Sequence, residues 1–219
     1  GITNDLKLIF LISAAAFIIG LLFTIKLPNP VQEKELKPGT TRQIISKNKF
    51  LFLSLLLRHI GAAAVWVILP IMIMEKWGGD LYHISVVYVA NTLTAFILMN
   101  VMASKIHLSN ITKFKIGIGA TTFVFVGLAF VTDWWMAMPF MSLVGATWAF
   151  LFIGGNFHLM ENNPRSTSTG IFSSTLSIAT VIGPVIGGTI AFLFDYVAVL
   201  YFAVVIIVCA FIVSLKIKK

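Results

Sequence analysis

Arg58 and His59 are two adjacent ionisable residues inside a long apolar stretch of the sequence. If residues 50–74 form a helix, the pair lies roughly 12 Å from its first end, at 1.5 Å per residue. Neighbouring helical residues point about 100° apart, so we expect only one of the two to face a cavity directly. An arginine at this depth can attract an anion or act in a gate, and a histidine can change charge near neutral pH. The alternative for Arg58 is a side chain that extends to the membrane surface and fixes the depth of the helix.

Other polar side chains recur within apolar stretches, where they can bond a solute. Tyr88 and Asn91 lie three residues apart, on one stripe of a helix. Such groups can equally bond a neighbouring helix, with a contribution of about 0.6 kcal/mol each. Trp148 can stack on an aromatic or cationic ligand, with packing as the alternative. The residues that we expect in substrate binding or gating are Arg58, His59, Tyr88, Asn91, Trp148, Asn156, Ser174 and Ser177.

No pattern in the sequence indicates an enzymatic activity or a bound cofactor. The four His are scattered, so no metal-ligand spacing appears, and neither a nucleophile triad nor a glycine-rich phosphate loop is present. No Asp or Glu lies in the middle of an apolar stretch, so proton coupling through a membrane carboxylate is not supported. We therefore expect no enzyme, no cofactor and no metal.

The composition predicts the class of protein that positions these residues. Hydrophobic residues make up 58% of the chain and charged residues 11%, against about 25% charged in a soluble domain. Most of the surface must then face lipid, and we expect an all-α polytopic membrane bundle. About seven stretches approach the roughly 20 residues that a spanning helix needs. They are Leu6–Ile25, Phe50–Met74, Ile84–Ser104, Phe114–Val131, Trp134–Met160, Thr169–Phe194 and Val197–Leu215.

The basic residues are distributed unevenly between the connections. Thirteen of the 16 Lys and Arg residues lie in alternate connections and in the carboxy-terminal tail. The positive-inside rule places these segments in the cytoplasm, with the amino terminus outside and the carboxy terminus inside. The net charge of +8 is thus explained by topology and by anionic lipid, and we expect no nucleic-acid partner. Trp77 and Trp134 fall at the opposite ends, where amphipathic rings anchor helices.

The connections predict three parts of the chain. Residues 1–27 would be a single transmembrane helix, residues 28–49 a cytoplasmic linker, and residues 50–219 a six-helix bundle. The linker is polar and rich in proline, and Thr40–Ser46 within it is compatible with a short interfacial helix. Asn91–Thr94 resembles Ser174–Ser177 three helices later, as an inverted three-plus-three repeat or chance similarity would give.

Several motifs resemble those of the major facilitator superfamily of transporters. Gly183-Pro184-Val185-Ile186-Gly187-Gly188, preceded by Glu161-Asn162-Asn163-Pro164-Arg165, is similar to the end of that family's tenth helix and to its eleventh helix. The helix with Arg58, His59, Gly61 and Pro70 resembles its seventh, and the long linker its central loop. The family's loop signature with an Asp is absent from Ala103–His107, which puts the charge latch of that motif in doubt.

The resemblance implies part of a 12-helix transporter. The first helix would be the last of an amino-terminal bundle that this chain lacks, and residues 50–219 the carboxy-terminal bundle. We expect transport of a small organic solute by alternating access, in the plasma membrane or prokaryotic inner membrane. Besides the lipid bilayer, the partners would be that solute and the missing bundle. A seven-helix receptor or sensor is the alternative, although the last helix has no interior Lys for a retinal Schiff base.

Two sets of residues would carry the movement of such a transporter. Proline kinks a helix and glycine allows close helix contact, so Gly183, Pro184, Gly187 and Gly188 are expected to form a hinge and a packing surface. Static packing is the alternative. Glu161 and Arg165, four residues apart at a cytoplasmic corner, are expected to pair as a gate when the cavity closes.

Overall fold

All regular structure in the described part of the chain is α-helical. The computed structural model describes residues 2–25 and 40–217. The helices are α1 (Ile2–Ile25), α2 (Thr41–Lys47), α3 (Lys49–Glu75), α4 (Leu81–Ser104), α5 (Asn110–Leu128), α6 (Trp134–Asn162), α7 (Arg165–Leu193) and α8 (Tyr196–Leu215). The predicted all-α class is confirmed, and the predicted short helix at Thr40–Ser46 corresponds to α2. Most of the predicted linker, residues 28–39, lies outside the described residues.

Six of these helices, α3 to α8, are long and apolar enough to cross a membrane. They correspond to the last six of the seven predicted spans. The first predicted span corresponds to α1, whose described apolar part, Phe10–Ile25, is shorter. The chain divides into two compact units, with α1 in the first and α2 to α8 in the second. The structure is thus that of a multi-span membrane protein with six long helices and a shorter apolar one at its amino terminus.

Polar side chains at the helix starts fix where the helices begin. The hydroxyl of Thr40 and the amide of Gln43 form a reciprocal capping box at α2. Asp80 and Ser109 accept hydrogen bonds from backbone N–H groups of the first turns of α4 and α5, which satisfies donors that a helix start leaves open. The cap at Ser109 starts α5 four residues before the predicted Phe114, and the helix ends at Leu128 rather than Val131.

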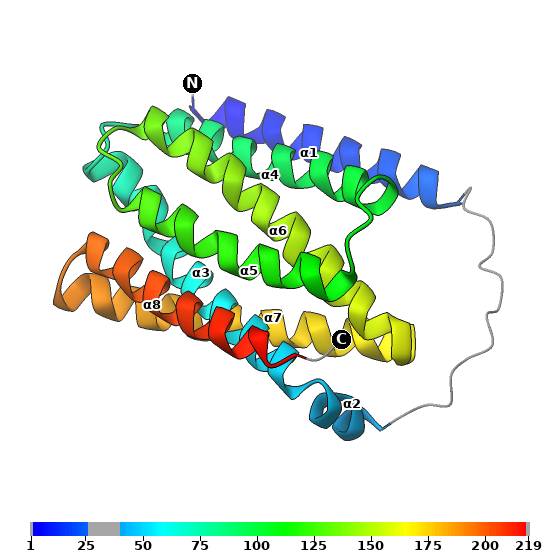
Figure 1. Ribbon diagram of the computed structural model, residues 1–219. Helices are drawn as coiled ribbons and strands as arrows, with labels where there is room; N and C mark the ends of the chain where they lie inside the picture. Colours follow the sequence, from blue (N-terminus) through cyan, green and yellow to red (C-terminus); the bar gives the residue numbers. More distant parts are fainter. Residues whose placement is uncertain (1, 26–39, 218–219) are drawn as a thin grey trace. The chain divides into compact units, whose positions relative to one another are not determined.

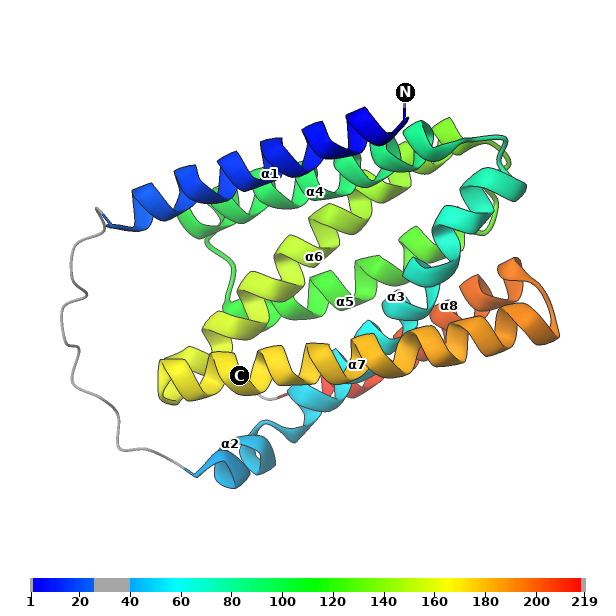
Figure 2. The same ribbon diagram turned by 180° about the vertical axis from the view of Figure 1, so that it is seen from behind.

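Two helices organise the packing of the second unit (Figures 1 and 2). The main partners of α3 are α7 and α8, and those of α6 are α4 and α5. A further contact joins α5 to α8, with smaller ones from α3 to α4 and from α6 to α7. Exchanging α3, α4 and α5 with α6, α7 and α8 maps these contacts onto one another, but a small contact between α7 and α8 has no counterpart of its size between α4 and α5. The packing therefore has the form that an internal three-plus-three repeat would give.

Burial differs strongly between the helices. In the most apolar stretch of α3, 67% of the residues are buried, against 11% in α4 and 17% in α7. The buried residues of α3 include Leu55, Ala64, Val65 and Leu69, all with no exposed surface. The helix thus runs through the core of the unit, and residues in its middle are shielded by other helices.

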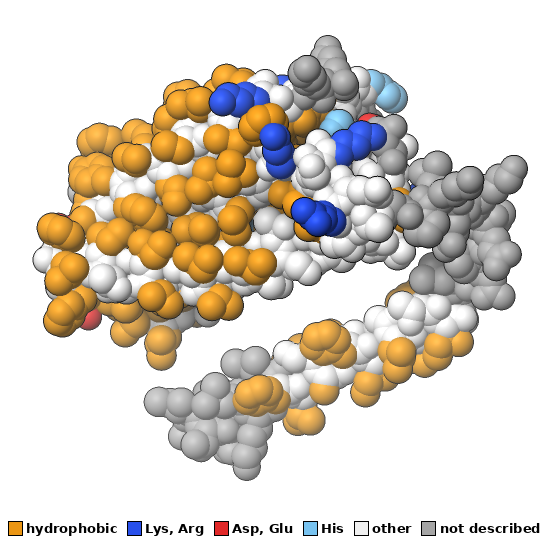
Figure 3. Space-filling view, turned by 90° about the horizontal axis from the view of Figure 1, so that it is seen from below, with side chains coloured by type: hydrophobic (Ala, Val, Ile, Leu, Met, Phe, Trp, Pro, Cys, Tyr) orange, Lys and Arg blue, Asp and Glu red, His pale blue; other side chains and the backbone are white. Residues whose placement is uncertain are grey.

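The outer surface separates apolar and charged side chains. Figure 3 shows one face on which hydrophobic side chains are widespread, while Lys and Arg gather toward one end. Because successive helices alternate in direction, Lys49, Lys105, Arg165 and Lys216 lie at the same end of the bundle. Trp77 belongs to the opposite end, but it is 3% exposed and packs in the core. That burial argues against the interfacial anchor that its position in the sequence suggested.

Candidate functional site

A polar cavity of about 270 Å³ lies between the middles of α3, α4 and α6. Four residues that the sequence singled out separately meet there: Arg58, His59, Asn91 and Trp148. The lining consists of Arg58, His59, Trp66, Asn91, Thr92, Ala95, Val144 and Trp148. Three of these residues are aromatic or imidazole rings and one is a guanidinium, so the cavity offers both stacking surfaces and hydrogen-bond donors.

A second cavity, of about 420 Å³, differs in chemistry. It lies between α5 and α6 and has no ionisable side chain in its wall. Its lining is Ile116, Ala120, Phe123, Val124, Phe140, Leu143, Ala146, Thr147 and Phe150. A hollow of this kind on a lipid-facing bundle offers no means of recognising a polar solute. The polar cavity is therefore the candidate site.

Arg58 is the buried cation of the polar cavity, at 2% exposure. Its Nη2 donates to Thr121 Oγ1 of α5 at 3.3 Å. Its Cζ lies 5.6 Å from the centroid of the Trp148 ring, within the range of a cation–π contact. Its Nε is buried without a hydrogen-bond partner among the described residues. The side chain is thus held inside the bundle and does not extend to the surface, as the alternative reading of Arg58 required.

The charge of Arg58 has no carboxylate partner in the described part of the chain. The two ion pairs found there join His83 to Asp80 and His158 to Glu161. A buried charge without a partner destabilises a fold by several kcal/mol, so the polar groups that remain around it matter. The acidic side chains that the structure describes all belong to helix ends or connections: Glu75, Asp80, Asp133, Glu161 and Asp195.

His59 links the cavity to α7. Its Nε2 lies 3.4 Å from Thr180 Oγ1, and its ring centroid is 5.6 Å from that of Trp148 at an interplanar angle of 32°. Its Nδ1 is buried with no hydrogen-bond partner in the described residues. Arg58 and His59 both line the cavity, although their helical spacing predicted that only one would face it.

The α4 wall of the cavity is tied to α3 and α6. Tyr88 donates its hydroxyl proton to the carbonyl of Trp66 at 3.3 Å, and the two rings are 5.9 Å apart. The backbone carbonyl of Asn91 lies so close to Gly145 of α6 that a Cβ there would overlap it. Asn91 is therefore held at a tight helix crossing with its side chain in the cavity wall, while Tyr88 supports the wall from outside the lining.

Besides Tyr88, three predicted site residues lie outside the cavity lining. Asn156 is 5% exposed on α6, and its Oδ1 is buried without a partner in the described residues. Ser174 and Ser177 are exposed on α7, and Ser177 Oγ donates to the carbonyl of Ser173 at 3.1 Å. The structure thus does not join these three to Arg58, and their roles stay predictions.

The glycines of α7 form its contact with α3. A Cβ on Gly183 would lie 2.6 Å from Ala63 Cβ, and one on Gly187 would lie 2.5 Å from the carbonyl oxygen of Ala64. Gly188 faces open space, with nothing within 4 Å of its would-be Cβ. Pro184 lies within the same helix. Close backbone packing therefore occurs at two of the three predicted glycines, about one and two turns beyond the Thr180–His59 contact.

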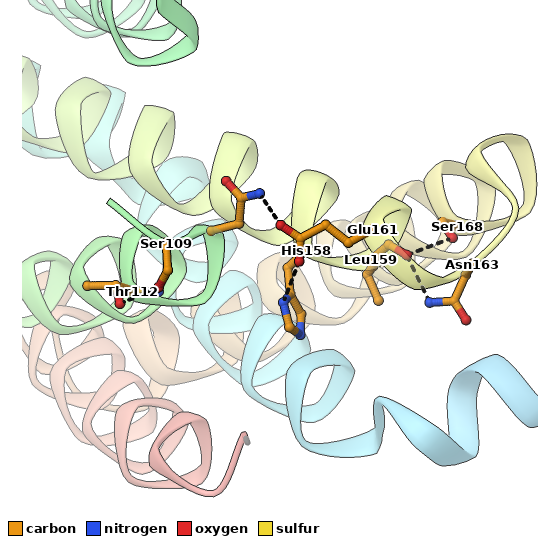
Figure 4. A network of polar contacts seen from close by, with 8 residues as sticks. Ser109, Thr112, His158, Leu159, Glu161, Asn163 and Ser168 are labelled. Atoms are coloured by element: carbon orange, nitrogen blue, oxygen red, sulfur yellow. Dashed lines mark hydrogen bonds and ion pairs between the residues drawn. The ribbon is translucent and has the colours of Figure 1, made fainter. Parts of the chain in front are cut away.

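Glu161 lies in a polar network at the junction of α5, α6 and α7 (Figure 4). Its Oε1 accepts a hydrogen bond from Asn110 Nδ2 at 2.6 Å, and its Oε2 lies 3.6 Å from His158 Nδ1. Next to it, Asn163 donates to the carbonyl of Leu159 at 2.8 Å. In the described residues Glu161 is thus paired within α6 and with α5. A pairing with Arg165 in another state stays a prediction.

Sequence reasoning missed Trp66 and Val144 in the cavity lining, and Thr121, which bonds Arg58 from outside the lining. Trp66 follows His59 by seven residues, a spacing that returns to the same helix face and could have identified it. Thr121 has no such signal, because a threonine in an apolar helix usually bonds its own backbone, as it also does here to Gly117 at 2.6 Å. No three His, Cys, Asp or Glu residues that could hold a metal lie together in the part of the chain that the structure describes.

No family model matches the sequence, and no curated protein matches it either. The resemblance to the major facilitator superfamily therefore stays a prediction from the motifs. The fold supports the coarser conclusion, a multi-span membrane protein, and it has a polar cavity between three of its long helices.

Proposed function

We propose that this chain takes part in moving a small organic solute across a membrane, in the manner of a major facilitator transporter. The observation that carries the proposal is the polar cavity around Arg58, half-way along three long apolar helices. Ionisable groups at such depth are costly in a membrane protein and usually mark a substrate or ion pathway. The cavity is also of the size that suits a small molecule, just below the roughly 300–1,000 Å³ of drug-sized sites.

The contact between α3 and α7 offers a moving part for this function. Gly183 and Gly187 bring the two backbones close, and Pro184 weakens the regular hydrogen bonding of α7 at the same level. Thr180 on the same helix contacts His59 in the cavity wall. A change in the tilt of α7 would therefore move the cavity wall at His59, as alternating access requires.

The proposal includes a second helical bundle against which this one moves. By the resemblance, α1 would belong to that bundle, and α3 to α8 would form the carboxy-terminal one. The repeated packing of α3 and α6 is compatible with the inverted repeats on which such transporters are built. The uneven basic residues favour a plasma or prokaryotic inner membrane with the carboxy terminus in the cytoplasm.

Solute uptake into proteoliposomes that contain this chain assembled with the second bundle tests the proposal. We expect time-dependent uptake of at least one solute from a panel of organic acids, sugars and amines, and its loss when Ala95→Leu fills the cavity. Saturable binding of a solute without any uptake would overturn the proposal and favour a receptor or sensor.

Labelling of single cysteines tests the access to the cavity independently. In a Cys209→Ser background, Thr92→Cys should react with a membrane-impermeant thiol reagent from both sides of the bilayer. Ile97→Cys is the matched control, since Ile97 is 50% exposed on the same helix but does not line the cavity. Reaction of Thr92→Cys from neither side, or from one side in every condition, would contradict alternating access.

A further inference from the structure

The charged group that lines the cavity, Arg58, keeps one hydrogen-bond donor open. Arg58 Nε carries a proton, lies buried and has no partner among the described residues. His59 Nδ1 is also buried and unpartnered. The hydroxyl of Thr180 donates to the carbonyl of Leu176 at 2.9 Å, so the contact with His59 uses Nε2–H and leaves a lone pair on Nδ1 of the neutral ring. A ligand that supplies an acceptor beside Arg58 would therefore satisfy the open donor of the buried cation.

The charge of the cavity has the same preference. Arg58 lines the cavity at 2% exposure, and no carboxylate side chain that the structure describes is paired with it. An anion placed beside the guanidinium would form the charge-assisted hydrogen bonds that the chain itself does not provide there. A cation would instead meet a like charge that no described carboxylate offsets.

The aromatic side chains in the cavity wall narrow the chemical class of the ligand further. Trp66 and Trp148 both line the cavity; the Trp148 ring lies 5.6 Å from that of His59, and the Trp66 ring 5.9 Å from that of Tyr88. Arg58 already lies over the Trp148 ring at 5.6 Å, so this ring is not free to bind a ligand cation on that face. Indole edges and the remaining indole surface favour a flat, unsaturated group. The volume of about 270 Å³ leaves room for a small molecule only.

We propose that the polar cavity is a binding site for a small aromatic carboxylate, with Arg58 as the group that binds the carboxylate and Trp66 and Trp148 as the walls for the ring. The proposal deepens the proposed function and rests on it only for the statement that the bound anion is carried across the membrane. Binding itself is independent of transport.

Calorimetric titration of the full chain in lipid nanodiscs with three matched probes tests the site. Benzoate, benzamide and benzylamine share one ring and differ in being anionic, neutral and cationic. We expect benzoate to bind at least about tenfold more tightly than benzamide, because a charge-assisted hydrogen bond exceeds a neutral one by about that factor. Benzylamine should bind more weakly than both. Equal or tighter binding of benzamide or benzylamine, or no binding of benzoate, would overturn the proposal without any variant.

Variants then assign the selectivity to the cavity. Arg58→Gln should weaken benzoate binding by roughly 10- to 100-fold and abolish the preference over benzamide. Arg58→Lys keeps the charge but not the planar fork, and should retain part of the preference. Lys105→Gln is the control, since Lys105 is an exposed basic residue outside the lining. If Lys105→Gln weakens binding as much as Arg58→Gln, or Arg58→Gln leaves the benzoate preference intact, the anion binds elsewhere and the proposal fails.

The binding and uptake experiments fail separately. Benzoate-selective binding without uptake of any solute would leave the anion site in place and refute the transport function. Uptake of a neutral or cationic solute, with no preference for benzoate in the titration, would support transport and refute the anion site.

Discussion

Gly187 lies where the backbone of α7 comes closest to that of α3, and Gly187→Ala should push the two helices apart. The added Cβ would stand 2.5 Å from the carbonyl oxygen of Ala64 and 2.8 Å from its Cα. An ordinary contact is about 3.5 Å, so the shortfall is about 1 Å. Both atoms belong to backbone inside a buried helix, and no side chain can turn aside to make room. We expect a loss of stability of about 1–3 kcal/mol, the usual cost of overpacking.

Gly188→Ala is the matched control for this prediction. It makes the same chemical change one residue further on, where nothing lies within 4 Å of the added Cβ. Both variants gain the helix propensity of alanine, up to about 1 kcal/mol, so their difference isolates the α3–α7 contact. The measurement is reversible unfolding in mixed micelles, followed by circular dichroism. Equal stabilities of the two variants, or a larger loss in Gly188→Ala, would refute the close packing described for α7.

Three further predictions concern hydrogen bonds. Thr121→Val should destabilise the fold by about 1.5 kcal/mol, because the Arg58 guanidinium loses its acceptor at 3.3 Å, whereas Thr121→Ser should not; equal denaturation curves for the two variants would contradict this. The His83 backbone N–H that donates to Asp80 holds the pKa of the Asp80 carboxyl below its usual value of about 3.9. The stability that Asp80 contributes is therefore complete above the usual pKa and is lost as the pH falls through the lower folded pKa. Wild-type protein should lose more stability between pH 5 and pH 2 (on the order of the titration range of Asp80) than Asp80→Asn, which keeps a cap that does not titrate. Parallel curves of stability against pH for the two proteins would contradict the cap. Tyr88→Phe removes one hydrogen bond between α4 and α3 and should cost about 0.6 kcal/mol in the same unfolding assay, and a loss several times larger would indicate a role beyond that bond.

The long helices were predictable because each is an almost unbroken apolar stretch. The start of α5 was not, since Lys113 and Lys115 in its first turns suggested a polar connection. In the fold Lys113 is 6% exposed, and its Nζ is 3.5 Å from the carbonyl of Met102 at the end of α4. A lysine can thus lie in a buried helical turn when a helix carboxy terminus supplies acceptors. That pairing depends on tertiary structure and has no signal in local sequence.

The residues of the site were easier to predict than their proximity in the fold. Arg58, His59, Asn91 and Trp148 were recognised because polar or large amphipathic groups are unusual deep in apolar stretches. Their convergence depends on which helices are neighbours, and hydropathy does not determine this.

The predicted pairing of Glu161 with Arg165 spans a junction between two helices. Spacing of four residues suggests contact only within one helix. Here α6 ends at Asn162 and α7 begins at Arg165, with Asn163 in an extended conformation between them. The helical spacing rule therefore does not apply across this junction. Glu161 accepts a hydrogen bond from Asn110, and its pairing with Arg165 stays a prediction.

The central position of α3 has a consequence for biosynthesis. Its main packing partners, α7 and α8, are the last helices of the described chain, and Arg165 at the start of α7 follows Glu75 at the end of α3 by 90 residues. At about 5–20 residues per second, a ribosome needs roughly 5–20 s after the end of α3 to reach the start of α7. During that interval α3 waits in the translocon or the bilayer with its inward face uncovered, and Arg58 has no Thr121 to bond until α5 arrives. The helix that is most buried in the finished fold is thus the one whose inward face stays unpacked longest during synthesis. A chain that stalls before α7 would leave α3 exposed to quality-control proteases.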